Sequence, residues 1–233
     1  MQEQYVRYYS SYLGRDLEML VFGHSGFPVV LFPTAEGRYF EHKDMEMIEA
    51  VKWFLHNGVV KIYCPDTING MSWLNSEVSP ADRVRNHILY DKLLNDELVP
   101  NIMEETGCSK VAAAGCGFGG YHAANLAFKH PEKVSHLFSM GGFFDVRHQL
   151  DGFYNEDIYF NNPVDFLPGS NHPDLWQMKI ILGTSDQDLG KHSNIQMSEI
   201  LRAKGIDHWL DIRQGEQGWE IWREMLPQYL SIM

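Results

Sequence analysis

Short apolar runs alternate with helical patterns along most of the chain, and this alternation restricts the fold more than any other feature. The runs are rich in β-branched or aromatic residues and occupy residues 17–23, 28–33, 59–64, 110–115, 134–140, 178–183 and 208–212. The helical patterns cover residues 43–57, 82–106, 119–130, 192–204 and 219–231. Near-continuous apolar strands that alternate with helices are typical of a mostly parallel, twisted sheet with helices on both faces. We therefore expect an α/β fold.

Three local features refine this expectation. Only residues 24–27 separate the first two runs, a hairpin-length link, so the sheet is expected to begin with an antiparallel pair. Pro100 lies inside the second helical pattern and predicts a kink or two helices there. Residues 141–177 are rich in Gly, Asn, Asp, Pro and aromatic residues, which predicts an excursion over the strand ends that forms a lid or pocket wall. Because no linker or repeat divides the chain, residues 1–233 are expected to form a single domain.

Composition excludes several classes of partner. Nineteen Lys and Arg against 31 Asp and Glu give a net charge of −12, which would repel nucleic acid and anionic membrane surfaces. Three cysteines without CxxC spacing indicate neither a disulfide framework nor a structural zinc site, and they fit a reducing cytoplasm. The N-terminal residues are polar and no apolar window is long enough to span a membrane. A soluble, cytoplasmic protein is therefore expected.

The most informative motif lies between the strand at 110–115 and the helix at 119–130. It reads Gly115-Cys116-Gly117-Phe118-Gly119-Gly120. A small-residue strand that turns sharply into a helix is where α/β-hydrolases place the G-x-S-x-G nucleophile elbow. In this chain the central residue of that pattern is itself a glycine, Gly117.

Several stretches of the sequence, taken together, resemble the esterase D-like esterase family of the α/β-hydrolases. They occur in the family's order and spacing and cover residues 23–41, 71–75, 115–131, 143–169 and 222–230. The resemblance implies an α/β-hydrolase fold with an antiparallel start. It also implies a Ser–Asp–His hydrolase of small carboxylic or thiol esters that needs no metal or cofactor, with a small-molecule ester or acyl compound as its ligand.

Transferred to this chain, the family's triad retains only its acid. The nucleophile position is Gly117, the acid is Asp186, and the histidine position holds Gln217. Glycine has no attacking atom, and a neutral amide does not accept a proton near pH 7 as imidazole does. Loss of both groups costs about 10⁶ in rate in a subtilisin-type enzyme. The family's mechanism is therefore expected to be inactive.

The oxyanion site, in contrast, depends on the backbone. In this fold it uses the amide that follows the nucleophile and one from the loop after an early strand. These donors are expected at Phe118 and at Ala35 or Glu36. Because backbone donors survive side-chain substitution, a polarising pocket is expected to persist.

Other groups near the pocket are candidate replacements for the lost ones. Glu36, His148 and His42 are candidates for a new base, each against the simpler reading of a solvated or packing residue. Cys116 precedes the vacant position, but the family resemblance favours a structural role for it. Serines near strand ends are weaker candidates for a new hydroxyl group: Ser25, Ser72, Ser139 and Ser185.

Two functional hypotheses follow. The substitutions around one cavity mostly shorten side chains, which suggests a pocket emptied by design, as in a knockout or a re-engineered esterase with a new nucleophile or base. The alternative is a non-catalytic relative that binds a small acyl or carboxylate ligand. Whether the chain is an enzyme stays open between the two.

Overall fold

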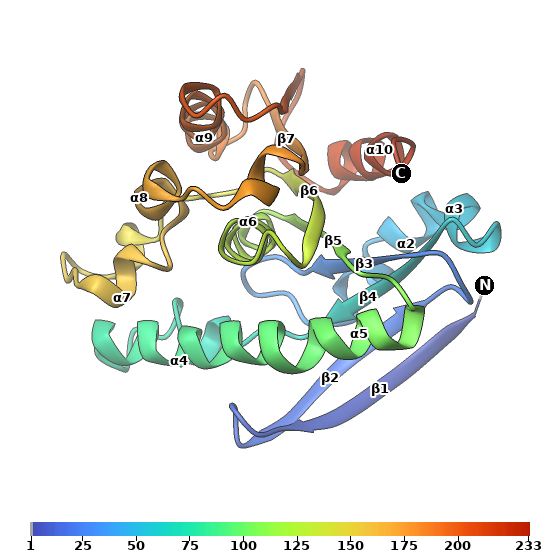
Figure 1. Ribbon diagram of the computed structural model, residues 1–233, viewed down its shortest axis with the longest axis horizontal. Coiled ribbons are helices and arrows are strands. Elements are labelled where there is room, and N and C mark those ends of the chain that lie inside the picture. The colour runs from blue at the N-terminus through green and yellow to red at the C-terminus, as the bar shows by residue number, and fades with distance from the viewer. Residues whose placement is uncertain (1) are drawn as a thin grey trace.

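The computed structural model describes residues 2–233 and contains one eight-stranded sheet (Figure 1). The strands are β1 (Glu3–Ser10), β2 (Arg15–Phe22), β3 (Phe27–Phe32), β4 (Val60–Pro65), β5 (Val111–Cys116), β6 (Val134–Met140), β7 (Lys179–Ser185) and β8 (Trp209–Arg213). Their spatial order is β1-β2-β4-β3-β5-β6-β7-β8. The β1–β2 and β2–β4 pairs are antiparallel, and every pair from β4–β3 to β7–β8 is parallel. The expected α/β-hydrolase fold with an antiparallel start is confirmed.

Helices cover both faces of this sheet. They are α1 (Glu41–Asp44), α2 (Met47–Ala50), α3 (Lys52–His56), α4 (Pro80–Lys92), α5 (Val99–Thr106), α6 (Phe118–Lys129), α7 (Glu156–Tyr159), α8 (Pro163–Phe166), α9 (Lys191–Ala203) and α10 (Trp219–Leu230). One core cluster joins α4, α5, α6 and α9 to one face, and a second joins α2, α3 and α10 to the other. The central strands are apolar along their whole length because both of their faces are buried.

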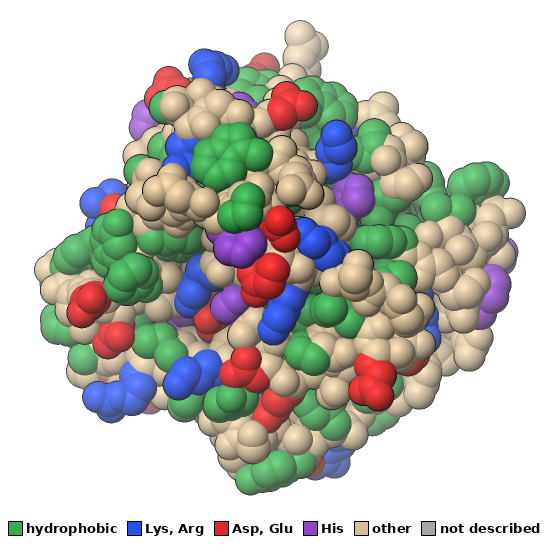
Figure 2. Space-filling view, in the orientation of Figure 1, with side chains coloured by type: hydrophobic (Ala, Val, Ile, Leu, Met, Phe, Trp, Pro, Cys, Tyr) green, Lys and Arg blue, Asp and Glu red, His purple; other side chains and the backbone are tan. Residues whose placement is uncertain are grey.

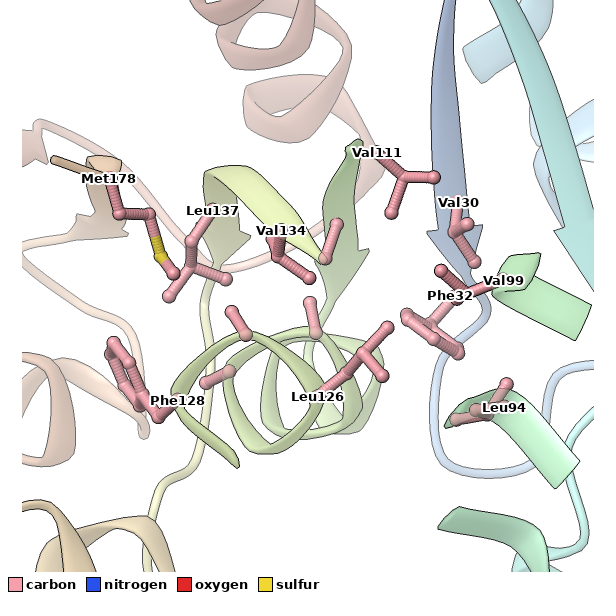
Figure 3. Packing of buried hydrophobic residues seen from close by; sticks show 14 of the residues in the cluster. Val30, Phe32, Leu94, Val99, Val111, Leu126, Phe128, Val134, Leu137 and Met178 are labelled. Atoms are coloured by element: carbon pink, nitrogen blue, oxygen red, sulfur yellow. The ribbon is translucent and has the colours of Figure 1, made fainter. Parts of the chain in front are cut away.

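Small residues let α6 pack closely against the centre of the sheet. Strand β5 carries three alanines at positions 112–114, all fully buried, and almost every residue of α6 is buried as well. Figure 3 shows Leu126 and Phe128 on α6 near Leu137 of β6 and Phe32 of β3. This packing holds the N-terminus of α6 directly at the carboxyl end of β5.

The antiparallel start differs from its expected strands. β2 and β3 run in opposite directions but are not paired, because β4 lies between them. β2 pairs instead with β4 on one side and with β1 on the other, and the sequence did not predict β1 as a strand. β1 lies at the sheet edge, and most of its residues are exposed, so it lacks the apolar run that marks a buried strand. The predicted 24–27 hairpin is therefore wrong, although the antiparallel beginning is correct.

Two predicted helices are also divided. Residues 43–57 form three short helices, α1 to α3, with Glu46 in the left-handed region at φ 60° between the first two. The 82–106 pattern is continuous but changes to a π-helical segment at Leu93–Leu98 between α4 and α5. Pro100 follows this segment at the start of α5 and has no N–H to donate, which explains the change of hydrogen bonding there.

The parallel strands place several loops at one edge of the sheet. β3, β5, β6, β7 and β8 all point the same way, so the segments that follow them meet at their carboxyl ends. The segment after β6, residues 141–177, contains α7, α8 and several short 3₁₀ turns. No helix among residues 2–233 is both long and apolar enough to cross a membrane. The face seen in Figure 2 carries acidic and basic side chains interspersed.

Candidate active site

Gly117 forms a sharp bend between β5 and α6. Its backbone angles are φ 55° and ψ −120°, a conformation that side-chain-bearing residues adopt only under strain. The Gly117 amide donates to the carbonyl of Met140 at 2.8 Å, and its own carbonyl accepts from the Gly120 amide at 2.9 Å. The strand–turn–helix geometry expected for a nucleophile elbow is thus present, with glycine at its apex.

The glycines on either side of the bend are required by close backbone contacts. A β-carbon on Gly115 would collide with the Gly119 carbonyl, and one on Gly119 would collide with the Phe32 carbonyl at the end of β3. At Gly117, in contrast, a β-carbon would meet only the Trp222 ring, at 3.9 Å. The bend therefore excludes side chains at its flanks but has room for one at its apex.

A cavity of about 710 Å³ opens above the bend. It is lined by Thr34, Ala35, Glu36, Leu74, Gly117, Phe118, Phe143, Asp145, His148, Gln149, Gln217 and Trp222. Six residues that the sequence singled out are in this lining: Gly117, Gln217, Phe118, Ala35, Glu36 and His148. The expected acid, Asp186, is not. The segment 141–177 contributes four of the lining residues.

The two expected oxyanion amides belong to rigid segments of this wall. Phe118 is the first residue of α6, so its N–H has no acceptor within the helix and lies at the positive end of the helix dipole. Ala35 belongs to a turn in which the Gly37 amide donates to the Thr34 carbonyl at 3.2 Å. The Glu41 carboxylate accepts hydrogen bonds from the Thr34 amide at 2.8 Å and the Thr34 hydroxyl at 2.7 Å. A carboxylate bound twice in this way fixes the start of the turn.

A buried polar chain holds the other side of the same turn. The Asn69 amide nitrogen donates to the Ala35 carbonyl at 3.0 Å, and the Asn69 side-chain oxygen lies 2.8 Å from His122 Nε2. This arrangement makes Nε2 the protonated nitrogen of a neutral imidazole. Burial lowers the pKa of His122 to about 3, so the ring stays neutral at physiological pH. The turn that carries Ala35 is therefore supported by both Glu41 and Asn69.

The carboxylate of Asp186 is not part of the cavity lining. Asp186 is exposed, and its Oδ1 accepts a hydrogen bond from the Gly215 amide at 2.8 Å. Its amide donates to the Arg213 carbonyl at 2.8 Å. Asp186 thus fastens the loop after β8, which carries Gln217, to the end of β7. Its expected role as the triad acid stays a prediction.

A second carboxylate, Asp188, lies closer to the interior. It is buried at 7% exposure and accepts hydrogen bonds from the Thr184 hydroxyl at 3.1 Å and the Gly190 amide at 2.6 Å. A β-carbon placed on Gly141 would lie 2.9 Å from Asp188 Oδ2 and 3.2 Å from Gln217 Nε2. The Asp188 carboxylate and the Gln217 amide therefore both lie close to Gly141.

The other candidate replacements have different surroundings. His42 is fully buried, its Nε2 lies 2.9 Å from the Phe32 carbonyl, and burial lowers its pKa to about 4. Cys116 is fully buried, and burial raises the pKa of its thiol. Neither residue lines the cavity. His148 and Glu36 do line it, and both are exposed. None of the serine candidates is in the lining: Ser25, Ser72, Ser139 and Ser185.

Several lining residues had no individual signal in the sequence. Trp222 lies one turn inside α10, where it reads as an ordinary residue of an apolar helix face. Phe143 and Asp145 belong to residues 141–177, which the sequence predicted as a pocket wall without indicating which of these residues line the cavity. In the described part of the chain, no group of three His, Cys, Asp or Glu side chains is placed to hold a metal ion.

Residues 31–232 match the model of the family Esterase, described as "Putative esterase". The chain belongs to this esterase family. A comparison with curated proteins gives no match.

Solved esterase structures share the fold of this family member at low sequence identity. A ferulic acid esterase is 16% identical with a TM-score of 0.79, and the match covers 100% of this chain and 98% of that one. An S-formylglutathione hydrolase from Agrobacterium tumefaciens is 16% identical with a TM-score of 0.74, over 99% and 93% of the two chains. A CE1 ferulic acid esterase from the anaerobic fungus Anaeromyces mucronatus is 13% identical with a TM-score of 0.73, over 98% and 89%.

Proposed function

We propose that this esterase-family chain binds a small acyl ligand in the elbow cavity without hydrolysing it. The observation that carries the proposal is the bare elbow, because Gly117 faces the cavity at the apex of an otherwise intact bend. Gln217 stands in the same wall and offers an amide instead of an imidazole. The chain thus keeps a shaped cavity and loses the groups that attack and transfer protons.

The backbone supports ligand binding at the same site. The Phe118 amide at the start of α6 and the braced Ala35 turn are suited to bind a carbonyl oxygen through hydrogen bonds. Such amide donors also form hydrogen bonds with the carbonyl of an unreacted ester, so they can bind the ligand even where no hydrolysis follows. A cavity of about 710 Å³ accommodates a small ester, amide or thioester.

A replacement nucleophile has less support. Of the residues that line the cavity, Thr34 alone carries a hydroxyl group, and that hydroxyl donates to Glu41 at 2.7 Å. The same carboxylate also binds the Thr34 amide, so the arrangement fixes a turn and does not free an attacking oxygen. The re-engineered hydrolase is therefore the second hypothesis.

The test uses 3,3-dimethylbutyl acetate, a neutral ester, with binding followed by NMR titration and ester integrity followed in the same tube. We expect saturable binding with the ester intact, and no labelling of a cavity residue by a fluorophosphonate probe. The control variant Leu74→Trp, which fills the cavity from its wall, should abolish binding while the melting temperature stays near that of the parent. Steady turnover above the buffer rate, or binding that survives Leu74→Trp, would contradict the proposal.

A further inference from the structure

The charge at the cavity wall is negative. The lining contains two carboxylates, Glu36 and Asp145, and none of its described residues is Lys or Arg. Asp145 is neutralised by Arg147, whose Nε lies 2.8 Å and 3.0 Å from its two oxygens. Burial raises the pKa of Asp145, but the hydrogen bonds from Arg147 outweigh it and hold that pKa below its ordinary value. The carboxylate of Asp145 is therefore charged and already paired.

Glu36 is the carboxylate of this wall that forms no ion pair. Its side chain is exposed and has no basic partner within 4.0 Å in the part of the chain that the structure describes. Arg15 and Arg38 line a neighbouring cavity with Glu36, and Arg38 is paired with Glu18 and Asp66. It directly follows Ala35, so the negative charge stands beside the expected oxyanion donor. A carboxylate there opposes an anionic ligand and favours a cationic one, since like charges repel across a partly desolvated wall.

Aromatic rings complete the wall of the cavity that carries this charge. Phe118, Phe143 and Trp222 line the cavity, and the end of the Trp222 ring lies 3.9 Å from where a β-carbon on Gly117 would stand. Aromatic faces attract ammonium groups through the ring quadrupole, and several rings around one space recognise quaternary ammonium ions. Rings and a free carboxylate in one cavity combine the two interactions that stabilise an organic cation.

We propose that the elbow cavity selects acyl ligands that carry a positive charge, such as the esters or amides of a quaternary or alkylated amino alcohol. The inference rests on the proposed function, because it names the ligand class of the same cavity. The acyl carbonyl binds the backbone amides of Phe118 and the Ala35 turn. The ammonium group lies near Glu36 and the aromatic rings. The carboxylate ligand that the sequence left open is disfavoured by the same charge.

Two ligands of equal shape test this selectivity. Acetylcholine and 3,3-dimethylbutyl acetate differ only in the replacement of the ammonium nitrogen by carbon. We expect acetylcholine to bind about two- to fivefold more tightly at low ionic strength, a ratio typical of one exposed ion pair or cation–π contact. Glu36→Gln should remove most of this preference and leave the affinity for the neutral ester unchanged. Glu199→Gln, an exposed carboxylate of α9 outside the cavity, should leave both affinities unchanged.

Each outcome separates the two proposals. Equal affinity for both ligands in the parent protein would overturn the charge selectivity and leave the binding proposal standing. A preference for acetylcholine that survives Glu36→Gln but disappears in 0.5 M salt would assign it to the overall charge of −12 and overturn the role of Glu36. Absence of binding by both ligands would overturn both proposals. Hydrolysis of acetylcholine with the preference intact would overturn only the absence of catalysis.

Discussion

Restoring two side chains should restore ester hydrolysis if the elbow is placed correctly. The variant combines Gly117→Ser with Gln217→His, which returns an attacking oxygen and a base to the cavity. A serine β-carbon fits at position 117, since its nearest neighbour is the Trp222 ring at 3.9 Å. A positioned general base contributes about 10²–10⁴-fold. We therefore expect the double variant to hydrolyse esters about 10²–10⁴-fold faster than Gly117→Ser alone.

The same change should cost stability. Position 117 has φ 55° and ψ −120°, a region that glycine tolerates and serine occupies under strain. Strain of this kind costs about 1–3 kcal/mol, and in a chain of this size each kcal/mol lowers the melting temperature by about 2–4 °C. The Gly117→Ser proteins should therefore melt several degrees below the parent and still be folded at room temperature.

The assay compares the parent, both single variants and the double variant. Hydrolysis of p-nitrophenyl acetate is followed together with the size of the initial burst, which counts acylated sites, and with the melting temperature of each protein. We expect a burst in the double variant, with the acyl group located at position 117 by peptide mapping. A folded double variant that hydrolyses the ester no faster than the parent would refute the assignment of positions 117 and 217.

The acid of the restored triad can be identified in the same background. Asp188 is buried beside Gln217, whereas Asp186 is exposed and accepts the Gly215 amide. Asp188→Asn should therefore lower kcat of the double variant by about 10²–10⁴-fold, because the imidazole loses the group that orients its tautomer. Asp186→Asn should change it little. The reverse pattern would assign the acid to Asp186, as the sequence resemblance implies.

Three further predictions concern the frame around the site. Gly119→Ala should destabilise the fold by about 3 kcal/mol or more, because its β-carbon meets backbone carbonyls after β3, and chemical denaturation should show Gly117→Ala to be milder. Burial lowers the pKa of His42 to about 4 from an unfolded value of about 6.5. The free energy of unfolding is therefore unaffected by this residue above pH 6.5 and falls by about 3 kcal/mol by pH 4, because the unfolded chain binds the proton more readily. Thermal unfolding from pH 7 to pH 4 should show this loss, and His42→Gln should reduce it. If the melting temperature of the variant falls with pH as steeply as that of the parent, the loss does not come from His42. Glu41→Gln weakens the two hydrogen bonds that hold Thr34, so hydrogen exchange of residues 33–37 should accelerate and ester affinity should fall about tenfold. An unchanged exchange rate would show that Glu41 does not hold this turn.

The sequence predicts the central sheet well because strands buried on both faces consist of consecutive apolar residues. Strands β3 to β7 are enclosed between helix layers and read as apolar runs that no loop would carry. β1 escaped notice because Tyr5, Arg7 and Tyr9 face solvent at the sheet edge. The false hairpin has another cause. The link at 24–27 is short enough for a hairpin, and only the tertiary fold inserts β4 between its two strands.

The site was predictable where one local pattern determines it. The glycine spacing around Gly117 identifies the elbow because backbone contacts forbid side chains on both sides. Trp222 and Phe143 come from separate segments, and nothing local to either signals that they line one cavity. Asp188 comes from a third segment, and only the fold places it with Gln217 and Trp222 around Gly141. The family resemblance assigned the acid to Asp186, and the sequence did not single out Asp188, because burial of that second carboxylate is a property of the folded turn.

The tight contacts at Gly115 and Gly119 determine which positions of the bend can accept a substitution. The bend is fixed by the close backbone contacts of Gly115 and Gly119. The apex residue, Gly117, makes no such contact and has space around it. The side chain at the apex can therefore change while the backbone contacts on both sides of it stay the same. The residues that set the shape of the bend and the residue that would supply its chemistry are thus different ones.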